Sequence, residues 1–227
     1  MGVHIAEGIL PAQWAAAWFA PAAAVVGKGL KDMGRRAREV PVSKPFFGIL
    51  GAAVFIISLL PIPVPIAGTS SHPAGTPLAA ILVGPFLSAV LAAVALFLQA
   101  LLFAHGGLTT LGANIVSEGV VGSFVAYAVF LLGRKGRLSL FWSGALAGFL
   151  GDLSVYLTTS LELALALHGR QPVPEAALTF FVAYLPTQLP LAILEGVFTG
   201  LALRFVAERR PDILSRLGVL VPEGVRS

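Results

Sequence analysis

The 227-residue chain is 57% hydrophobic and only 11% charged, with a mean hydropathy of +0.89 and a net charge of +4. A soluble domain carries about 25% charged residues, so this composition excludes a water-soluble globular protein and indicates a polytopic membrane protein. The sequence contains no cysteine, which excludes disulfides, thiolate metal sites and cysteine nucleophiles.

Six apolar blocks have lengths near or above the roughly 20 residues that a membrane-spanning helix needs. In chain order they cover residues 12–31, 45–60, 77–104, 115–132, 139–160 and 176–207. Pro186 and Pro190 interrupt the last block and should kink its helix. The stretch between the second and third blocks is polar, rich in proline and free of lysine and arginine.

Three clusters of basic residues follow or separate these blocks, which is typical of cytoplasmic loops. They comprise Lys28, Lys31, Arg35, Arg36, Arg38 and Lys44, then Arg134, Lys135 and Arg137, and finally Arg204, Arg209 and Arg210. The clusters lack interleaved aromatic residues, so we expect no nucleic-acid partner. They predict an amino terminus outside the membrane and a cytoplasmic carboxyl terminus, which requires an odd number of crossings.

Six visible blocks and an odd number of crossings imply one hidden span. We therefore predict an all-α bundle of seven transmembrane helices. The extra crossing is expected within 77–104 and the glycine turn that follows, as two short helices bent near Gly84-Pro85 or at the turn itself.

The chain has only four histidines. His4 precedes the first span and His72 lies in the loop "AGTSSHPAGTP", so both face the outer side and can meet if the amino terminus folds back into the bundle. His105 opens the turn "HGGLTTLGAN", where a structural hydrogen bond and a functional role are equally plausible. Asn114 could orient His105 or the ligand loop, or cap the helix that starts at 115. We expect His168 to be solvated.

A terminal amine, the adjacent backbone amides and a nearby imidazole can bind one Ni²⁺ or Cu²⁺ ion in a plane, whereas Mg²⁺ and Ca²⁺ prefer oxygen. If Met1 is kept, three amides separate the amine from the His4 ring, and a planar set of four nitrogen ligands forms poorly. A chain that starts at Gly2 supplies four nitrogens by itself. A chain that starts at Val3 supplies three, and His72 completes the set. The candidate ligands are therefore Met1, Gly2, Val3, His4 and His72.

Four carboxylic residues, Glu118, Asp152, Glu162 and Glu195, lie in or beside apolar spans. Ionisable groups in such places are costly and are commonly functional. Pairing with Arg204 or loop hydroxyls, or a position at an interface, are the alternatives. Gly144, Gly148 and Gly151 predict close helix contact, inside the bundle or with a partner subunit.

Four sequence blocks, "HIAEGILP", "SSHPAGTPLAAILVGP", "LLFAHGGLTTLGAN" and "QLPLAILEG", closely resemble the CbiM/NikM family. These proteins are the substrate-binding membrane components of energy-coupling-factor transporters for cobalt or nickel. The resemblance implies a buried planar metal site formed by the amine of the residue before His4, the amide and imidazole of His4, and His72. In this chain Met1 and Gly2 precede Val3, where the family pattern has the amine.

The resemblance also implies separate ATPase subunits, a coupling transmembrane subunit, a small accessory membrane subunit and a location in a bacterial or archaeal cell membrane. The sequence has no GxxxxGK[ST] phosphate loop, so ATP hydrolysis is expected in a partner and not in this chain. We expect Ni²⁺ or Co²⁺ as transported substrate and no bound cofactor. Residues 1–11 would be a metal-binding segment inserted into the bundle, 12–207 the transmembrane bundle and 208–227 a cytoplasmic tail.

Two other functions compete with metal uptake. A substrate-binding component for a vitamin would need a roomy aromatic pocket, which three Trp and three Tyr residues disfavour. An intramembrane hydrolase would have to work without an HExxH or GxSxG motif.

Overall fold

The computed structural model describes residues 4–40, 43–59, 62–63, 70–217 and 219. In chain order its elements are α1 (Ala12–Glu39), α2 (Ser43–Ser58), β1 (Ile62–Pro63), β2 (Ser70–Ser71), α3 (Thr76–Val83), α4 (Pro85–Phe103), α5 (Leu111–Asn114), the π-helix η1 (Ile115–Gly122), α6 (Ser123–Lys135), α7 (Leu140–Leu167), α8 (Val173–Arg209) and α9 (Pro211–Arg216). β1 and β2 form one short antiparallel pair, with Ile62 opposite Ser71.

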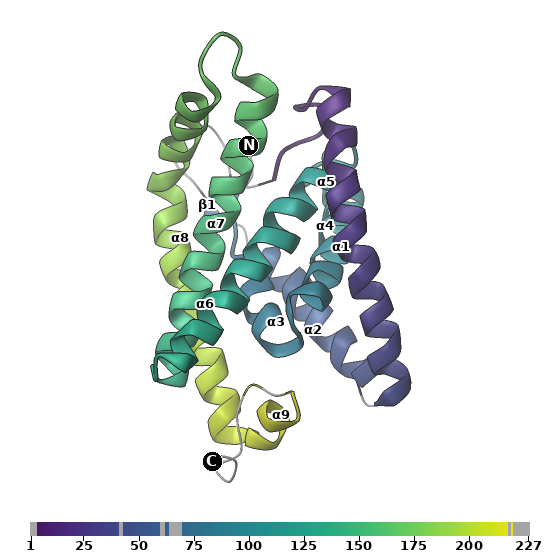
Figure 1. The fold of residues 1–227 in the computed structure, drawn as a ribbon, viewed down its shortest axis with the longest axis vertical. Coiled ribbons are helices and arrows are strands. Elements are labelled where there is room, and N and C mark those ends of the chain that lie inside the picture. The colour runs from purple at the N-terminus through teal and green to yellow at the C-terminus, as the bar shows by residue number, and fades with distance from the viewer. Residues whose placement is uncertain (1–3, 41–42, 60–61, 64–69, 218, 220–227) are drawn as a thin grey trace.

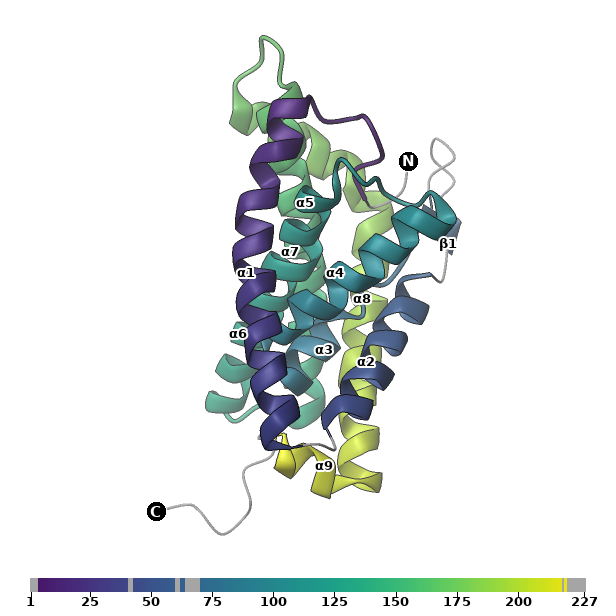
Figure 2. The same cartoon turned by 90° about the vertical axis from the view of Figure 1, so that its right-hand side faces the viewer.

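The helices form a single elongated bundle (Figures 1 and 2), with α7 packed along α8 and α6, and α1 packed along α4 and α5. Glycines allow α7 and α8 to approach closely, because a Cβ added at Gly148 would lie 2.9 Å from the Cα of Gly196. Small residues serve this purpose in membrane helices. The close helix contact predicted from Gly148 is therefore confirmed, and it lies within the bundle.

Four stretches of the described chain are long and apolar enough to cross a membrane: Pro85–Phe103, Leu111–Lys135, Leu140–Leu167 and Val173–Arg209. α2 is a shorter apolar helix. The protein is thus a helical, multi-pass membrane bundle, as its composition predicts. The count of seven spans and the sides on which the termini lie stay predictions.

The long apolar block 77–104 is broken between α3 and α4 at Gly84, which has φ of 89° and is followed by Pro85. Glycine adopts this φ without steric cost, and proline is well placed to begin the next helix. The predicted break at Gly84-Pro85 is confirmed. α3 is apolar on nearly all sides and almost wholly buried, as expected of a helix in the centre of a bundle.

Both figures show α9 and the connection between α6 and α7 at one end of the bundle, and the start of α1 and the α7–α8 connection at the opposite end. The basic clusters belong to the first of these ends, which the sequence predicts to face the cytoplasm. There Arg36 donates from Nη1 to the carbonyl oxygen of Val83, at the end of α3. α9 packs onto the bundle through the buried Leu214. α8 continues through both Pro186 and Pro190.

Candidate metal centre

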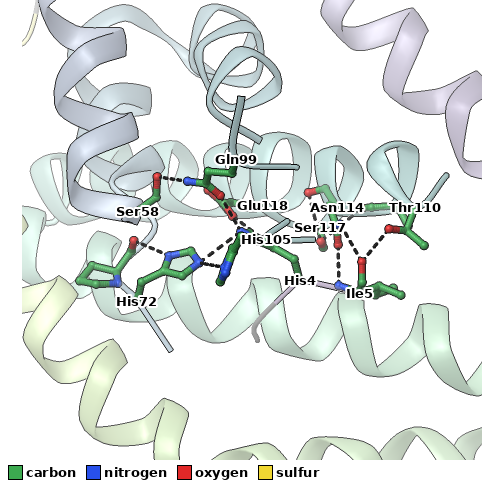
Figure 3. A network of polar contacts seen from close by, with 12 residues as sticks. His4, Ile5, Ser58, His72, Gln99, His105, Thr110, Asn114, Ser117 and Glu118 are labelled. Carbon is green, nitrogen blue, oxygen red and sulfur yellow. Dashed lines mark hydrogen bonds and ion pairs between the residues drawn. The ribbon is translucent and has the colours of Figure 1, made fainter. Parts of the chain in front are cut away.

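Three of the four histidines meet inside the bundle (Figure 3). The Nε2 atom of His72 lies 3.2 Å from Nε2 of His4 and 3.0 Å from Nε2 of His105. One ring nitrogen from each histidine lies within 4.8 Å of the other two. Metal–nitrogen bonds of about 2.0–2.1 Å set neighbouring ligand nitrogens about 2.9–3.4 Å apart. The spacing of His72 from each of the other two rings therefore fits neighbouring ligands of a single transition-metal ion.

Each ring comes from a different part of the chain. His4 belongs to the segment before α1, His72 directly follows β2, and His105 lies just beyond the end of α4. His4 and His72 are 4% and 2% exposed, whereas His105 is half-buried. His105 is therefore the most exposed of the three rings.

Burial keeps the three rings neutral. It lowers the pKa of His72 to about 4 and lowers the pKa of His105. Burial also holds the pKa of His4 well below its usual value, and the two neighbouring imidazoles lower it further. Because a neutral imidazole has a lone pair, each ring can bind a metal ion near pH 7.

Hydrogen bonds fix which nitrogen of His72 carries the proton. Its Nδ1–H donates to the carbonyl oxygen of Pro73 at 3.0 Å, and a carbonyl can only accept. The lone pair of His72 is consequently on Nε2, the atom that faces His4 and His105. A backbone acceptor on the far nitrogen is the usual way in which metal-binding histidines are oriented.

The His4 ring is held between two polar side chains. Its Nε2–H donates to Oε1 of Gln99 at 3.1 Å, and the amide of Gln99 in turn donates to Oγ of Ser58. Its Nδ1 lies 3.6 Å from Oε2 of Glu118. An ion bound at Nε2 would leave the proton on Nδ1, where the carboxylate of Glu118 faces it (Figure 3).

The segment that carries His4 is tied to the bundle through the next residue, Ile5. The Ile5 N–H donates to Oδ1 of Asn114 at 2.8 Å, and the Asn114 amide donates back to the Ile5 carbonyl at 3.1 Å. The hydroxyl of Thr110 donates to the same carbonyl at 2.6 Å. Both backbone polar groups of this buried residue are thus paired, so Asn114 and Thr110 fix the position of His4.

A second contact holds the segment three residues further on. The carboxylate of Glu7 accepts hydrogen bonds from the backbone N–H and the hydroxyl of Thr109. The hydroxyl bond is the main reason why the pKa of Glu7 is lowered. Residues 105–114 therefore receive the amino-terminal segment along its length.

The glycines of the "HGG" turn make room for this segment. A Cβ at Gly107 would lie 2.6 Å from the Cα and N atoms of Glu7, and a Cβ at Gly106 would lie 3.2 Å from the Cβ of His4. Gly106 also has φ of 80°, which favours glycine. The turn accordingly permits a close backbone approach that other residues would obstruct.

The structure brings together His4, His72, His105 and Asn114. Asn114 does not cap η1 with its side chain, and instead binds Ile5. Met1, Gly2 and Val3 lie outside the described residues. His168 is apart from the cluster and donates from Nδ1 to the carbonyl of Gln171 at 2.9 Å.

The sequence prediction assigned no role at this site to Gln99, Ser58 or Thr110. A signal for one of them is present, because Thr110, Asn114 and Glu118 recur at intervals of four residues. This interval places polar side chains on one face of an otherwise apolar helix. Gln99 is a single polar residue near the end of a long apolar run, and nothing nearby in the sequence indicates its partner.

The fold and the site together define a multi-pass membrane protein with a cluster of three histidine side chains inside the bundle. Residues 4–213 match the CbiM family, described as the cobalt uptake substrate-specific transmembrane region. The chain is 49% identical over 218 residues to a cobalt transport protein CbiM of Sorangium cellulosum, covering 96% of this chain and 97% of the relative. It is 48% identical to a cobalt transport protein CbiM of Geobacter sulfurreducens, covering 96% of this chain and 63% of that longer relative.

The fold is also similar to a crystal structure described as a transition metal transporter. The two chains are 29% identical, the TM-score is 0.78, and the match covers 95% of this chain and 97% of the other. This chain belongs to the CbiM family, and it is a membrane subunit for metal transport.

Proposed function

We propose that this chain is the substrate-capturing subunit of an ATP-driven energy-coupling-factor transporter, and that it takes up Co²⁺ or Ni²⁺. The observation that carries the proposal is the convergence of three neutral imidazoles on one point in the bundle. Imidazole nitrogen binds both metals. The names of the relatives favour Co²⁺ as the first substrate to test.

The segment before His4 would supply a further nitrogen, the terminal amine. A small chelate ring through a backbone amide would use Nδ1 of His4, whereas Nε2 is the atom that lies 3.2 Å from Nε2 of His72. We therefore propose three imidazole ligands with the amine as a fourth. A planar set made of the amine, the His4 amide, His4 and His72 would require the His4 ring to rotate.

Release toward the cytoplasm would be driven by partners. The sequence has no phosphate-binding loop, so a pair of ATPase subunits and a coupling membrane protein would supply the energy, with a small accessory membrane subunit beside them. Residues 208–227, beyond the end of the predicted last span, would face these cytoplasmic partners.

Titration of the purified full chain in detergent with Co²⁺, Ni²⁺ and riboflavin tests the proposal. We expect tight binding of both metals and none of riboflavin. His72→Ala should weaken metal binding by more than the about 10–100-fold that the loss of an outer hydrogen-bond partner costs.

His168→Ala is the matched control, because this histidine lies outside the cluster and should leave metal affinity unchanged. Unchanged affinity in His72→Ala, or binding of riboflavin in place of the metals, would contradict the proposed function.

A further inference from the structure

Three buried carboxylic acids lie on contacting helices near the middle of the bundle. Glu118 on η1, Asp152 on α7 and Glu195 on α8 are each at most 1% exposed. A Cβ added at Gly148, one helical turn before Asp152, would lie 2.8 Å from the carbonyl oxygen of Glu195, so α7 and α8 are in close contact beside these acids. Glu118, Asp152 and Glu195 together make up the carboxylate cluster.

The carboxylate cluster lies directly beside the histidine site. Glu118 faces His4 at 3.6 Å (Figure 3). Glu195 accepts a hydrogen bond of 3.2 Å from the backbone N–H of Gly75, three residues after His72 and at the start of α3. At 1.5 Å per helical residue, Asp152 lies about 18 Å from the start of α7 and about 22 Å from its end. The cluster thus extends from the histidines to the mid-plane of the span.

Most carboxylate oxygens of these acids have no hydrogen-bond partner. Both oxygens of Glu118, both of Asp152 and one of Glu195 are buried and form no hydrogen bond, which is five of six. Among the described residues, no lysine or arginine forms an ion pair with them. The alternative of pairing with Arg204 is wrong, since Arg204 binds Glu208.

Unpaired carboxylates inside a membrane protein are costly unless a cation or a proton joins them. Natural bundles fill such positions with apolar residues unless function requires otherwise. The buried hydroxyl of Thr199, one helical turn after Glu195, also has no partner. A Cβ at Gly148, one turn before Asp152, would lie 2.8 Å from that hydroxyl oxygen, so Thr199 faces α7 beside the cluster.

We infer that Glu118, Asp152 and Glu195 line a path of oxygen donors for the hydrated divalent cation after it leaves the three histidines. Among the described residues, only the three histidines are close enough together to hold one ion directly. This inference rests on the proposed function. Oxygen ligands hold Co²⁺ and Ni²⁺ less selectively than imidazole does, and carboxylates bind a divalent ion with its own water molecules readily. The imidazole nitrogens would capture the ion, and the carboxylate oxygens would stabilise it after it dissociates from them. The ion would then not have to pass through an apolar environment without ligands.

Further polar groups lie along the same route toward the cytoplasmic end. Ser88 donates to the carbonyl oxygen of Thr76, the first residue of α3, and Ser123 donates to the hydroxyl of Ser88. All three are buried. They continue the line of oxygens beside α3, whose far end is held by Arg36.

The test separates binding from transport, with Co²⁺ as the probe. Binding is measured on the purified full chain, and uptake in cells that produce the chain with its ATPase and coupling partners. Asp152→Asn, Glu195→Gln and the double variant should each bind Co²⁺ within about threefold of wild type, because they leave the nitrogen ligands in place. Uptake by the double variant should fall at least about tenfold, because it lacks two anionic stations in the bilayer.

Glu162→Gln is the matched control. Glu162 is another fully buried acid on α7 without hydrogen-bond partners, but it lies about 15 Å along the helix from Asp152. Its neutral variant should keep both binding and uptake. Asp152→Glu should recover part of the uptake lost in Asp152→Asn, because it restores the charge.

Unchanged uptake in the double variant would overturn the inference, as would loss of Co²⁺ binding in both single variants, which would assign the acids to the capture site. Full uptake in Asp152→Asn would show that polarity without charge suffices and would also overturn it. Failure of the proposed function is distinguishable, because wild-type chain would then not bind Co²⁺ at all.

Discussion

The histidine site and the carboxylate cluster are neighbours, but they differ in how their polar atoms are satisfied. Around the histidines, His72 is bonded to Pro73, His4 to Gln99 and Ile5 to Asn114. In the cluster, five of six carboxylate oxygens have no hydrogen-bond partner. A fully bonded site is rigid and selective, whereas an unsatisfied one is stabilised only while a cation or proton is present. The difference fits one region for recognition and the other for passage.

We expect metal recognition at the histidine site to depend most on the terminal amine of the segment that precedes His4. Acetylation of the terminal amine removes a lone pair, so it should abolish tight Ni²⁺ binding and leave the fold unchanged. Calorimetry on acetylated and untreated chain measures the effect, and mass spectrometry of the native terminus identifies the residue that carries the amine. Equal affinity in the two samples would leave only the three imidazoles as ligands.

The next largest effect is expected where the amino-terminal segment packs against the "HGG" turn. Gly107→Ala places a methyl group 2.6 Å from the backbone of Glu7, and overpacking of this kind costs about 1–3 kcal/mol. Co²⁺ affinity should fall by about 10- to 100-fold, since His4 can no longer be held in place. Gly48→Ala is the control, because a Cβ there meets nothing within 4 Å. Equal Co²⁺ affinity in both variants would show that metal binding does not depend on close packing of the amino-terminal segment against Gly107.

The pH dependence of binding distinguishes the ligand sets. The pKa of His72 is about 4, and the pKa values of His4 and His105 are also lowered, so protons compete little for these rings near neutral pH. A free amine has a pKa of about 8, so an amine ligand should weaken Co²⁺ binding about tenfold for each pH unit lost between about pH 7.5 and pH 6. A flat profile would indicate imidazole ligands alone, and a twofold steeper slope would indicate that a backbone amide is deprotonated as well.

The smallest expected effect concerns the stability of the carboxylate cluster. Asp152→Asn replaces a buried carboxyl group, which needs a proton to be neutral, with an amide that is neutral at every pH. At high pH this change should be worth about 1–2 kcal/mol and raise the melting temperature of the chain by roughly 2–6 °C. Asn114→Ala, in the histidine region, should lower it, because it leaves the Ile5 N–H unpaired. Thermal unfolding in the absence of added metal measures both. A drop in both variants would remove the contrast between the two regions.

Hydropathy and charge, read along the chain, determined the class of the protein. A membrane helix must be apolar over its own length, and Gly84-Pro85 breaks a helix through its own backbone, so both features can be read locally. His4, His72, His105 and Asn114 could also be selected, because polar residues are rare here and each lies beside a glycine turn, a terminus or a polar loop.

Only the tertiary structure decided which of these residues meet. His4 and Gln99 are 95 positions apart, and His4 and His72 are 68 apart, so their contact depends on how the helices pack. The same packing placed Glu118, Asp152 and Glu195 on contacting helices, whereas Arg204 pairs with Glu208. The spacing of residues within one helix predicts which face of that helix each side chain occupies. It does not predict which residues of other helices lie opposite, because that depends on how all the helices pack.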